Sequence, residues 1–372
     1  MNPGMKLLMI SGFGAASLEK QGAFYNTLEE LHKHWERIDI ISVSSRWFFS
    51  RPIEHVFFGN VFVHRSPLPL FLQPLFILIQ GVGLVSGYHH NVMTVHEYPP
   101  FYNGMGAWLL HMWTKIPYVA EIMHIPGYPR AAGFKERLYL FLMQNFIGLD
   151  TWKAKFVRII NQHEAPKFLA DAGIPREKMV YIPAFYIDLN IFLPRDIPKR
   201  YDLIFVGRLV QNKGIFLFLD ALRKGNHSAM IVGTGPEAQS VRAYIWKHNL
   251  QHRVTMHGWA KDSQEVAKLL NESRVLVMSS YNEGGPRVVL EAMACGVPVI
   301  ATSVGIVHDT IENGVSGLKV PWDGDAIAGS VEKLLSNEEL YRRFREKGLE
   351  IVKKFERTLS IQKLAEWLKS AA

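Results

Sequence analysis

The chain has 372 residues, of which 48% are hydrophobic and 20% charged, which excludes a disordered chain and suits two domains of ordinary size. The only cysteine, Cys295, excludes an intramolecular disulfide and favours a reducing, cytoplasmic environment. The net charge of +8 favours anionic partners such as phosphates or an acidic membrane surface. No motif of a nucleic-acid-binding module accompanies this charge, so no nucleic acid is expected as a partner.

Short apolar strands alternate with helical stretches along the whole chain. In the first half, the predicted strands are Leu7–Ile10, Ile38–Val43, Val92–Val95, Tyr118–Met123, Phe156–Ile160 and Val180–Ile182. The helices predicted between them are Ala23–His34, Leu72–Val85, Gly104–Trp113, Lys135–Phe146 and Ala165–Ala172. In the second half, the predicted strands are Leu203–Val206, Ala229–Val232, Val254–Met256, Val275–Met278, Pro298–Ala301 and Leu318–Val320. The corresponding helices are Ile215–Leu222, Ala238–His248, Gln264–Leu270, Arg287–Cys295 and Ala326–Leu335, with two more before the end.

This alternation predicts two α/β domains, each a doubly wound, Rossmann-like parallel sheet with helices on both faces. A proline-rich, charged stretch, 193–200, is typical of a connector and divides the chain. The predicted units are residues 1–195, residues 196–355 and a C-terminal segment, 356–372. That last segment is predicted to be an amphipathic helix without a partner strand, and we expect it to dock on the first domain.

One segment of the first half requires a membrane test. No charged residue lies between Arg65 and His89, a span long enough to cross a bilayer. Prolines, glutamines and glycines interrupt it, so we expect a buried or surface-lying helix of a soluble domain. Further apolar residues, if exposed, would form a patch for peripheral membrane contact, with a location on the inner face of the membrane. These residues are Trp47-Phe48-Phe49, Phe57-Phe58 and Leu68–Val85, beside Arg46, Arg51 and Arg65.

The segment with the clearest chemical signal follows the predicted strand Val275–Met278. A turn containing Gly284 and Gly285 leads into a helix, whose N-terminal amides form a seat for an anion such as phosphate. Glu283 lies on the turn and Glu291 about two helical turns later. Carboxylates do not bind phosphate but accept hydrogen bonds from hydroxyl groups. The pattern therefore indicates a sugar at one end of a phosphate site and a ribose at the other.

A second segment places two cations after a parallel strand. The strand Leu203–Val206 runs into Gly207 and Arg208, and Lys213 follows five residues later. Ligands of parallel sheets bind at the carboxyl ends of strands. Arginine and lysine together can neutralise a diphosphate, the arginine with directional hydrogen bonds.

These motifs closely resemble those of glycosyltransferase family 4, a retaining family with the GT-B architecture. The matching motifs in this chain are Gly207-Arg208-Leu209, Lys213-Gly214, Gly233-Thr234-Gly235-Pro236 and Glu283-x7-Glu291. A looser match in the first half places His124 at the end of a strand, as the family does with its active-site histidine. The resemblance spans nearly the whole chain. It implies two domains that face each other across a cleft.

The resemblance further implies a metal-independent hexosyltransferase without a cofactor. A hexose-type sugar would pass from a nucleoside-diphosphate sugar to a glycan, lipid-linked or small-molecule acceptor. The implied catalytic residues are His124 and Glu283. The implied donor-binding residues are Gly22, Arg208, Lys213, Gly233, Trp259, Glu283, Gly284, Gly285, Arg287, Val288 and Glu291. Alternatives are a GT-B phosphorylase or epimerase, or a non-catalytic sugar-nucleotide-binding partner of a larger assembly.

Two features of the sequence could indicate a metal-binding site, but we interpret both differently. Asp323-Gly324-Asp325 is an Asp-x-Asp sequence, but it precedes a predicted helix, and we expect Asp325 to cap that helix. The histidines of the first half match no common zinc spacing. The cations Arg208 and Lys213 would replace Mg²⁺ on the leaving diphosphate, so no metal site is predicted.

Overall fold

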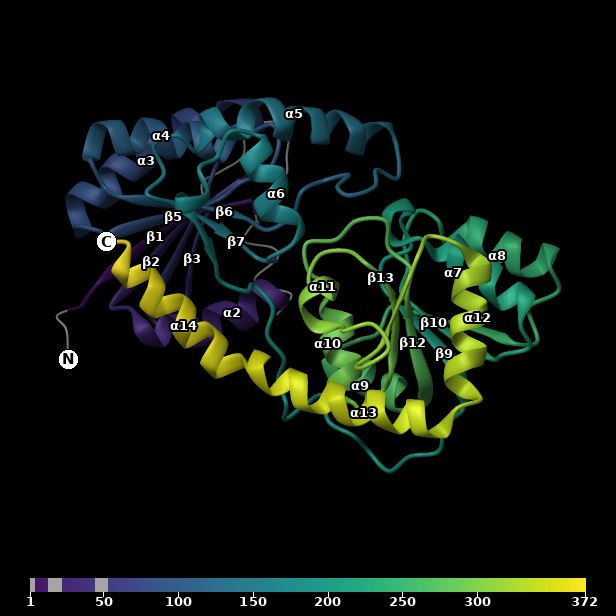
Figure 1. Ribbon diagram of the computed structural model, residues 1–372. Coiled ribbons are helices and arrows are strands. Elements are labelled where there is room, and N and C mark those ends of the chain that lie inside the picture. The colour runs from purple at the N-terminus through teal and green to yellow at the C-terminus, as the bar shows by residue number, and fades with distance from the viewer. Residues whose placement is uncertain (1–3, 13–21, 44–52) are drawn as a thin grey trace.

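The computed structural model describes residues 4–12, 22–43 and 53–372 and contains two α/β domains (Figure 1). Both domains hold parallel sheets, as predicted, because the strands are short apolar runs buried on both faces. Trp47-Phe48-Phe49, Arg46 and Arg51 lie outside the described residues, so the part of the predicted membrane patch that they form is not described.

The first domain has an eight-stranded sheet with the order β3-β4-β2-β1-β5-β6-β7-β8. The strands are β1 (Lys6–Ser11), β2 (Arg37–Ser42), β3 (Ile53–Phe57), β4 (Val61–Arg65), β5 (Val92–His96), β6 (Tyr118–Ile122), β7 (Phe156–Ile159) and β8 (Met179–Tyr181). The α-helices are α2 (Ala23–Leu31), α3 (Gln73–Tyr88), α4 (Tyr102–Thr114), α5 (Phe134–Asp150) and α6 (Glu164–Asp171). Three 3-10 turns are η1 (His32–His34), η2 (Leu70–Leu72) and η3 (Arg176–Lys178).

The sequence analysis missed the hairpin β3–β4 at the edge of this sheet. The two strands pair antiparallel across a turn in which Phe58 and Gly59 have positive φ angles of 52° and 77°. The Phe58 ring stacks on His32 with ring centroids 4.7 Å apart. This aromatic residue, predicted as part of a membrane patch, therefore packs within the domain.

The uncharged segment before His89 forms η2 and α3, and α3 packs beside α4 over one face of the sheet (Figure 1). Within the described ranges, Leu70–Tyr88 is one stretch of helix long and apolar enough to cross a membrane by length and composition. Close packing is possible because Gly81 lies against Leu110, and Gly106 lies against Ile77. The segment is thus a helix of the domain's outer layer.

The second domain has a six-stranded sheet with the order β11-β10-β9-β12-β13-β14, the 3-2-1-4-5-6 arrangement of doubly wound folds. The strands are β9 (Tyr201–Val206), β10 (Ala229–Val232), β11 (Val254–Gly258), β12 (Ser273–Met278), β13 (Val299–Thr302) and β14 (Leu318–Val320). The α-helices are α7 (Ile215–Lys224), α8 (Ala238–Lys247), α9 (Ser263–Asn271), α10 (Arg287–Ala294), α11 (Val307–Thr310), α12 (Gly324–Leu335) and α13 (Glu338–Val352). The 3-10 turns are η4 (Gln211–Lys213) and η5 (Lys353–Phe355).

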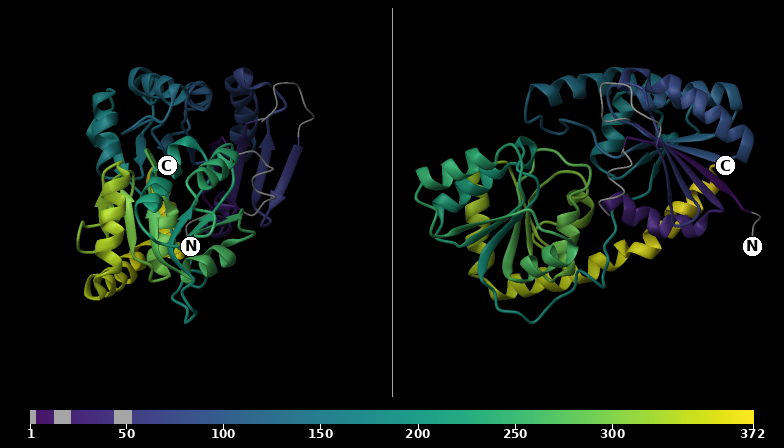
Figure 2. Two further views of the ribbon diagram at one scale, coloured as in Figure 1. Left: turned by 90° about the vertical axis from the view of Figure 1, so that its right-hand side faces the viewer. Right: turned by 180° about the vertical axis from the view of Figure 1, so that it is seen from behind.

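The C-terminal helix α14 (Arg357–Ser370) returns from the second domain to the first (Figures 1 and 2). It buries Ile361, Leu364 and Leu368 in a cluster with residues of β1, β2 and α2. At its start, Arg357 donates to the backbone oxygen of Asn26 at 2.7 Å. This helix ties the two domains together on the side of the linker.

A buried carboxylate in the first domain makes its stability depend on pH. The carboxylate of Asp39 accepts hydrogen bonds from Nε2 of His64 at 2.8 Å, Nε2 of His90 at 2.8 Å and Nε of Arg37 at 2.6 Å. Burial would raise the pKa of Asp39, but these hydrogen bonds outweigh it and hold the pKa below its usual value. The stability that Asp39 contributes is therefore fully present above its unfolded pKa and is lost progressively as the pH falls below that value and through the lower folded pKa.

Asp39→Asn is expected to lower the free energy of unfolding by about 2 kcal/mol at pH 7, because hydrogen bonds to a charged group are replaced by weaker ones. The difference from the parent protein should shrink as the pH falls below the unfolded pKa towards pH 3, because the unfolded carboxylate then takes up a proton while the folded one, with its lowered pKa, keeps its charge. Urea denaturation at both pH values measures the effect, with the exposed Asp196→Asn as the control. An equal loss at both pH values would contradict the electrostatic explanation.

Candidate active site

The carboxyl ends of strands from both domains meet at one place. His124 follows β6 of the first domain, and the segment 279–285 follows β12 of the second. Gly284 lies so close to the first domain that an added Cβ would be 2.0 Å from the backbone oxygen of Met123. His124, Glu283 and Gly284 line one small cavity. The glycine therefore permits the two strand ends to touch.

Glu283 lies at this meeting point and is bound by two side chains of its own domain. Its Oε1 accepts a charged hydrogen bond from Lys213 and a second, of 2.9 Å, from the Ser280 hydroxyl. The side chains of Lys213 and Glu283 are 22% and 12% exposed. Gly214 follows Lys213 and has a φ of +62°. An added Cβ on Gly214 would be 2.0 Å from the backbone oxygen of Ser279, so only glycine fits at this position. Two predicted site residues, 70 positions apart, are thus in direct contact.

His124 contributes a neutral imidazole to the same cavity. Its Nδ1 is buried and has no hydrogen-bond partner among the described residues. Burial lowers the pKa of His124, and the carboxylates of Glu283 and Glu136 oppose that shift without cancelling it. The ring therefore offers a hydrogen-bonding nitrogen rather than a positive charge at neutral pH.

Helix α10 begins after Gly284 and Gly285, with Pro286 as its N-cap. We expected both glycines to admit a ligand to the backbone. In the structure, protein atoms make the close approaches instead. Gly284 faces the Met123 oxygen, and an added Cβ at Gly285 would be 1.8 Å from the Phe185 ring. The close packing of these two glycines is therefore explained by contacts within the protein.

Three predicted residues lie on α10 itself. The Arg287 guanidinium lies 5.1 Å from the centre of the ring of Tyr186, which is in the segment between β8 and β9. Burial raises the pKa of Glu291, and the charge of Arg287 opposes the shift. Val288, between them in the sequence, is partly buried against the domain core. The helix therefore holds a half-buried carboxyl group about one turn after its start.

Three further predicted residues follow neighbouring strands of the second sheet. Arg208, Gly233 and Trp259 come after β9, β10 and β11, which lie side by side, so all three are at the same edge. Arg208 is exposed and Trp259 is 65% exposed. Gly233 has φ of +139° and packs so tightly that an added Cβ would be 1.9 Å from the Gly207 oxygen. Gly22 lies in the other domain, as the exposed N-cap of α2.

The sequence analysis missed the side chains that join the domains around Glu283. Nδ2 of Asn282 donates to the backbone oxygen of Arg130 at 2.8 Å and to Oε2 of Glu136 at 2.9 Å. On another side, Oε2 of Glu164 accepts from the backbone N–H of Gly305 at 2.8 Å. Asn282 precedes Glu283 directly, but no sequence signal indicates that it would contact a helix 146 positions away.

Comparison with known proteins identifies the family. The model of the family described as "Glycosyl transferases group 1" matches residues 192–350. An uncharacterized glycosyltransferase of Methanocaldococcus jannaschii is 33% identical over 276 residues, which cover 69% of this chain and 69% of that protein. The chain belongs to the group 1 glycosyltransferases.

Two solved structures have the fold of this group 1 glycosyltransferase over nearly its whole length. Sucrose-phosphate synthase from Thermosynechococcus elongatus has a TM-score of 0.78 at 20% identity, covering 99% of this chain and 100% of that one. Anabaena HepE, solved in complex with UDP and glucose, has a TM-score of 0.74 at 19% identity, covering 98% and 100%. These likenesses confirm the predicted GT-B fold. Other curated relatives match over a shorter stretch. In two of them, the matched residues cover 43% and 42% of the relative's own length.

The Asp-x-Asp sequence of this glycosyltransferase has a structural role. Asp323, not Asp325, caps α12, because its carboxylate accepts from the Ala326 N–H at 2.8 Å. The prediction for Asp325 was wrong: it lies inside the helix and forms a 2.7 Å ion pair with Lys224. Across the described ranges, no three His, Cys, Asp or Glu side chains are grouped as a metal ion would require.

Proposed function

We propose that the chain is a retaining, family 4 hexosyltransferase that moves a hexose-type sugar from a nucleoside-diphosphate sugar to a glycan, lipid-linked or small-molecule acceptor. The observation that carries the proposal is the contact of Lys213 with Glu283 beside His124, where the strand ends of both domains meet. A cation for a diphosphate and a carboxylate for sugar hydroxyls are thereby side by side. The similar fold of the Anabaena protein solved with UDP and glucose supports a nucleotide sugar as the donor.

Each of these residues has a proposed role. Arg208 and Lys213 would bind the diphosphate, and a phosphate beside Lys213 would compete with Glu283 for its ammonium group. Glu283 would orient the sugar hydroxyls, and Glu291 would accept from the ribose. The neutral ring of His124 would hydrogen-bond the sugar, consistent with its lowered pKa. Retention by front-face attack, with the leaving phosphate taking the acceptor's proton, is what the resemblance to family 4 implies.

The direct test is a thermal-shift panel of nucleoside diphosphates and their sugars, followed by measurement of nucleoside diphosphate release. A ligand present at a hundred times its Kd stabilises the folded protein by about 2.7 kcal/mol, which raises Tm visibly. We expect one base to be preferred and the matching sugar nucleotide to be turned over slowly without acceptor. Binding without any release, even with a range of acceptors, would favour a non-catalytic protein instead.

Turnover is expected to survive EDTA. The cations Arg208 and Lys213 would neutralise the leaving diphosphate, a task that Mg²⁺ performs in other transferases. Product formation should be the same after dialysis against EDTA as in buffer with added Mg²⁺. Loss of activity on chelation, with recovery on adding Mg²⁺ or Mn²⁺, would contradict the proposed metal independence.

We further propose that the protein works in the cytoplasm, on the inner face of a membrane. Large apolar side chains are exposed along η2, α3, α4, α5 and the residues that follow α5. They are Phe71, Leu75, Ile79, Met105, Trp108, Met112, Trp113, Phe134, Leu138, Phe141, Phe146, Leu149 and Trp152. Exposed Lys135, Arg137 and Lys153 lie among them and would attract anionic lipids.

Flotation with vesicles containing anionic lipid is expected to carry the protein upward. Trp113→Ser combined with Phe141→Ser should reduce the floated fraction severalfold, because these side chains are 74% and 58% exposed on that face. Trp246→Ser is the matched control, since Trp246 is 68% exposed on α8 of the other domain. Equal flotation of the double variant and the control would exclude this face as the contact.

A further inference from the structure

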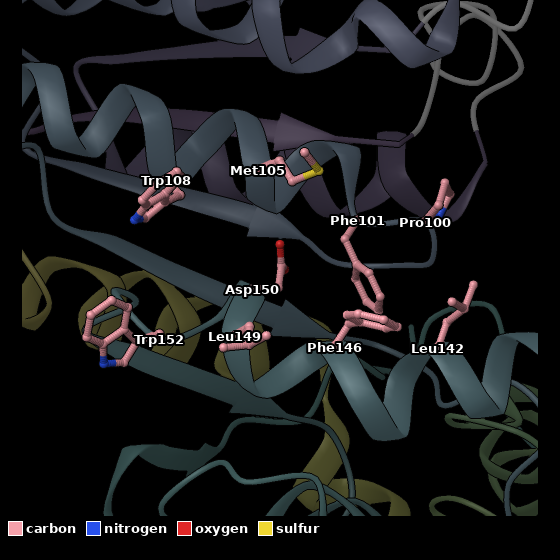
Figure 3. Close-up of a pocket in the computed structure, with 9 residues that line it drawn as sticks. All are labelled: Pro100, Phe101, Met105, Trp108, Leu142, Phe146, Leu149, Asp150 and Trp152. Carbon is pink, nitrogen blue, oxygen red and sulfur yellow. The ribbon is translucent and has the colours of Figure 1, made fainter.

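A second cavity lies in the first domain, between α4 and α5 (Figure 3). Its volume is about 450 Å³. Its lining is apolar and largely aromatic apart from one carboxylate. The lining residues are Pro100, Phe101, Met105, Trp108, Leu142, Phe146, Leu149, Asp150 and Trp152. None of them belongs to the proposed donor site.

The carboxylate is that of Asp150, the last residue of α5, and it points into the cavity between the two helices (Figure 3). Its Oδ2 is buried and has no hydrogen-bond partner among the described residues. Gly104 of α4 leaves room for it, because an added Cβ there would be 2.2 Å from that oxygen. The Asp150 carboxylate therefore fits here only because residue 104 is a glycine, since any larger side chain at that position would clash with it.

A second acid, Glu97, stands next to Asp150. Glu97 is only 4% exposed, and its carboxyl group donates a hydrogen bond to the Asp150 carboxylate and accepts one from the Gly104 backbone. Burial and the neighbouring Asp150 raise the pKa of Glu97 well above its usual value. Burial also raises the pKa of Asp150, to about 6. At neutral pH the pair therefore retains negative charge in an apolar setting.

This charge lacks a cation. The ion pairs formed by the described residues include neither Glu97 nor Asp150, although buried charges in proteins are normally paired. A ligand that entered the cavity with a positive charge would supply the missing partner. The surrounding rings would favour the same charge, because aromatic faces attract ammonium groups.

We propose that this cavity binds an organic ammonium group with an apolar substituent, held between the Asp150 carboxylate and the rings of Trp108 and Phe101. Such a group occurs both in free amines and in the headgroups of aminolipids. The cavity opens within the apolar face of α4 and α5, so either source can reach it. The inference is independent of the proposed transferase activity, since it involves different residues.

Isothermal titration calorimetry at pH 7.5 tests the inference with benzyltrimethylammonium, choline and 3,3-dimethyl-1-butanol, the uncharged carbon analogue of choline. We expect saturable binding of both ammonium compounds and at least tenfold weaker binding of the alcohol. Equal binding of choline and its neutral analogue, or no saturable binding of either ammonium compound, would overturn the proposal.

Variants add a second, independent readout. Asp150→Asn is expected to weaken benzyltrimethylammonium binding at least tenfold, and Trp108→Leu severalfold, while Trp246→Leu leaves it unchanged. Asp150→Asn should fold normally, because the amide oxygen of Asn can still accept the hydrogen bond from protonated Glu97, and Tm checks this. An Asp150→Asn protein that folds and keeps the parent affinity would show that the cavity is a hydrocarbon site.

Short-chain lipids distinguish the two sources of the ammonium group. Dihexanoylphosphatidylcholine, below its micellar concentration, is compared with dihexanoylphosphatidylglycerol. Tighter binding of the choline lipid than of choline, with the same loss in Asp150→Asn, would assign the site to a lipid headgroup. Binding of benzyltrimethylammonium with no binding of either lipid would assign it to a free amine.

Discussion

Replacing Glu283 with glutamine is expected to lower kcat by about 10²–10³-fold while changing the affinity for free nucleoside diphosphate only a few-fold. Gln keeps the size of the side chain and can still accept from the Ser280 hydroxyl. It removes the negative charge that would stabilise a developing positive charge on the sugar, so the loss falls on turnover. Lys213 loses its carboxylate partner in this variant and stays available to a diphosphate.

Glu291→Gln is the matched comparison, because it removes a carboxylate from the body of α10 rather than from the turn. We expect it mainly to raise the donor KM, since the proposed partner of Glu291 is the ribose. Steady-state kinetics and titration with free nucleoside diphosphate separate the two variants. If Glu283→Gln loses nucleotide affinity while Glu291→Gln retains it, the proposed direction of the donor along α10 is reversed.

The strands of the second sheet could be predicted well from the sequence, because each is marked by a pattern of neighbouring residues. The strands there are short apolar runs, and Gly207, Gly233 and Gly258 mark the ends of β9, β10 and β11. The predicted Leu203–Val206 and Val275–Met278 fall within β9 and β12. The hairpin β3–β4 was missed for the same reason. Its strands are half polar, and antiparallel pairing to an edge depends on contacts that a local pattern does not reveal.

Some residues of the candidate site could likewise be predicted from local patterns, and others could not. Lys213 and Glu283 could be predicted as site residues because each stands at the carboxyl end of a strand, and their contact follows from β9 and β12 being neighbours. The contact of Phe185 with Gly285 and the bridge from Asn282 to Glu136 could not be predicted. Both cross between domains or from the linker, and their partners are fixed by the packing of the domains. The same holds for Glu97 and Asp150, which lie on separate elements.

Arg208→Ala and Lys213→Ala are each expected to weaken donor binding by about 2–4 kcal/mol, a loss of roughly 30- to 1000-fold in affinity. Each removes a cation from the carboxyl end of β9, and a bound diphosphate would desolvate that charge. The two variants should differ in stability, because Lys213→Ala leaves Glu283 without its charged partner, whereas Arg208 is exposed. Calorimetric titration with the preferred nucleoside diphosphate measures the affinity, and Tm measures the difference in stability. Lys333→Ala, an exposed cation on α12, is the control for a general change in charge. If affinity and turnover are unchanged in both site variants, the diphosphate does not bind at this edge of the sheet.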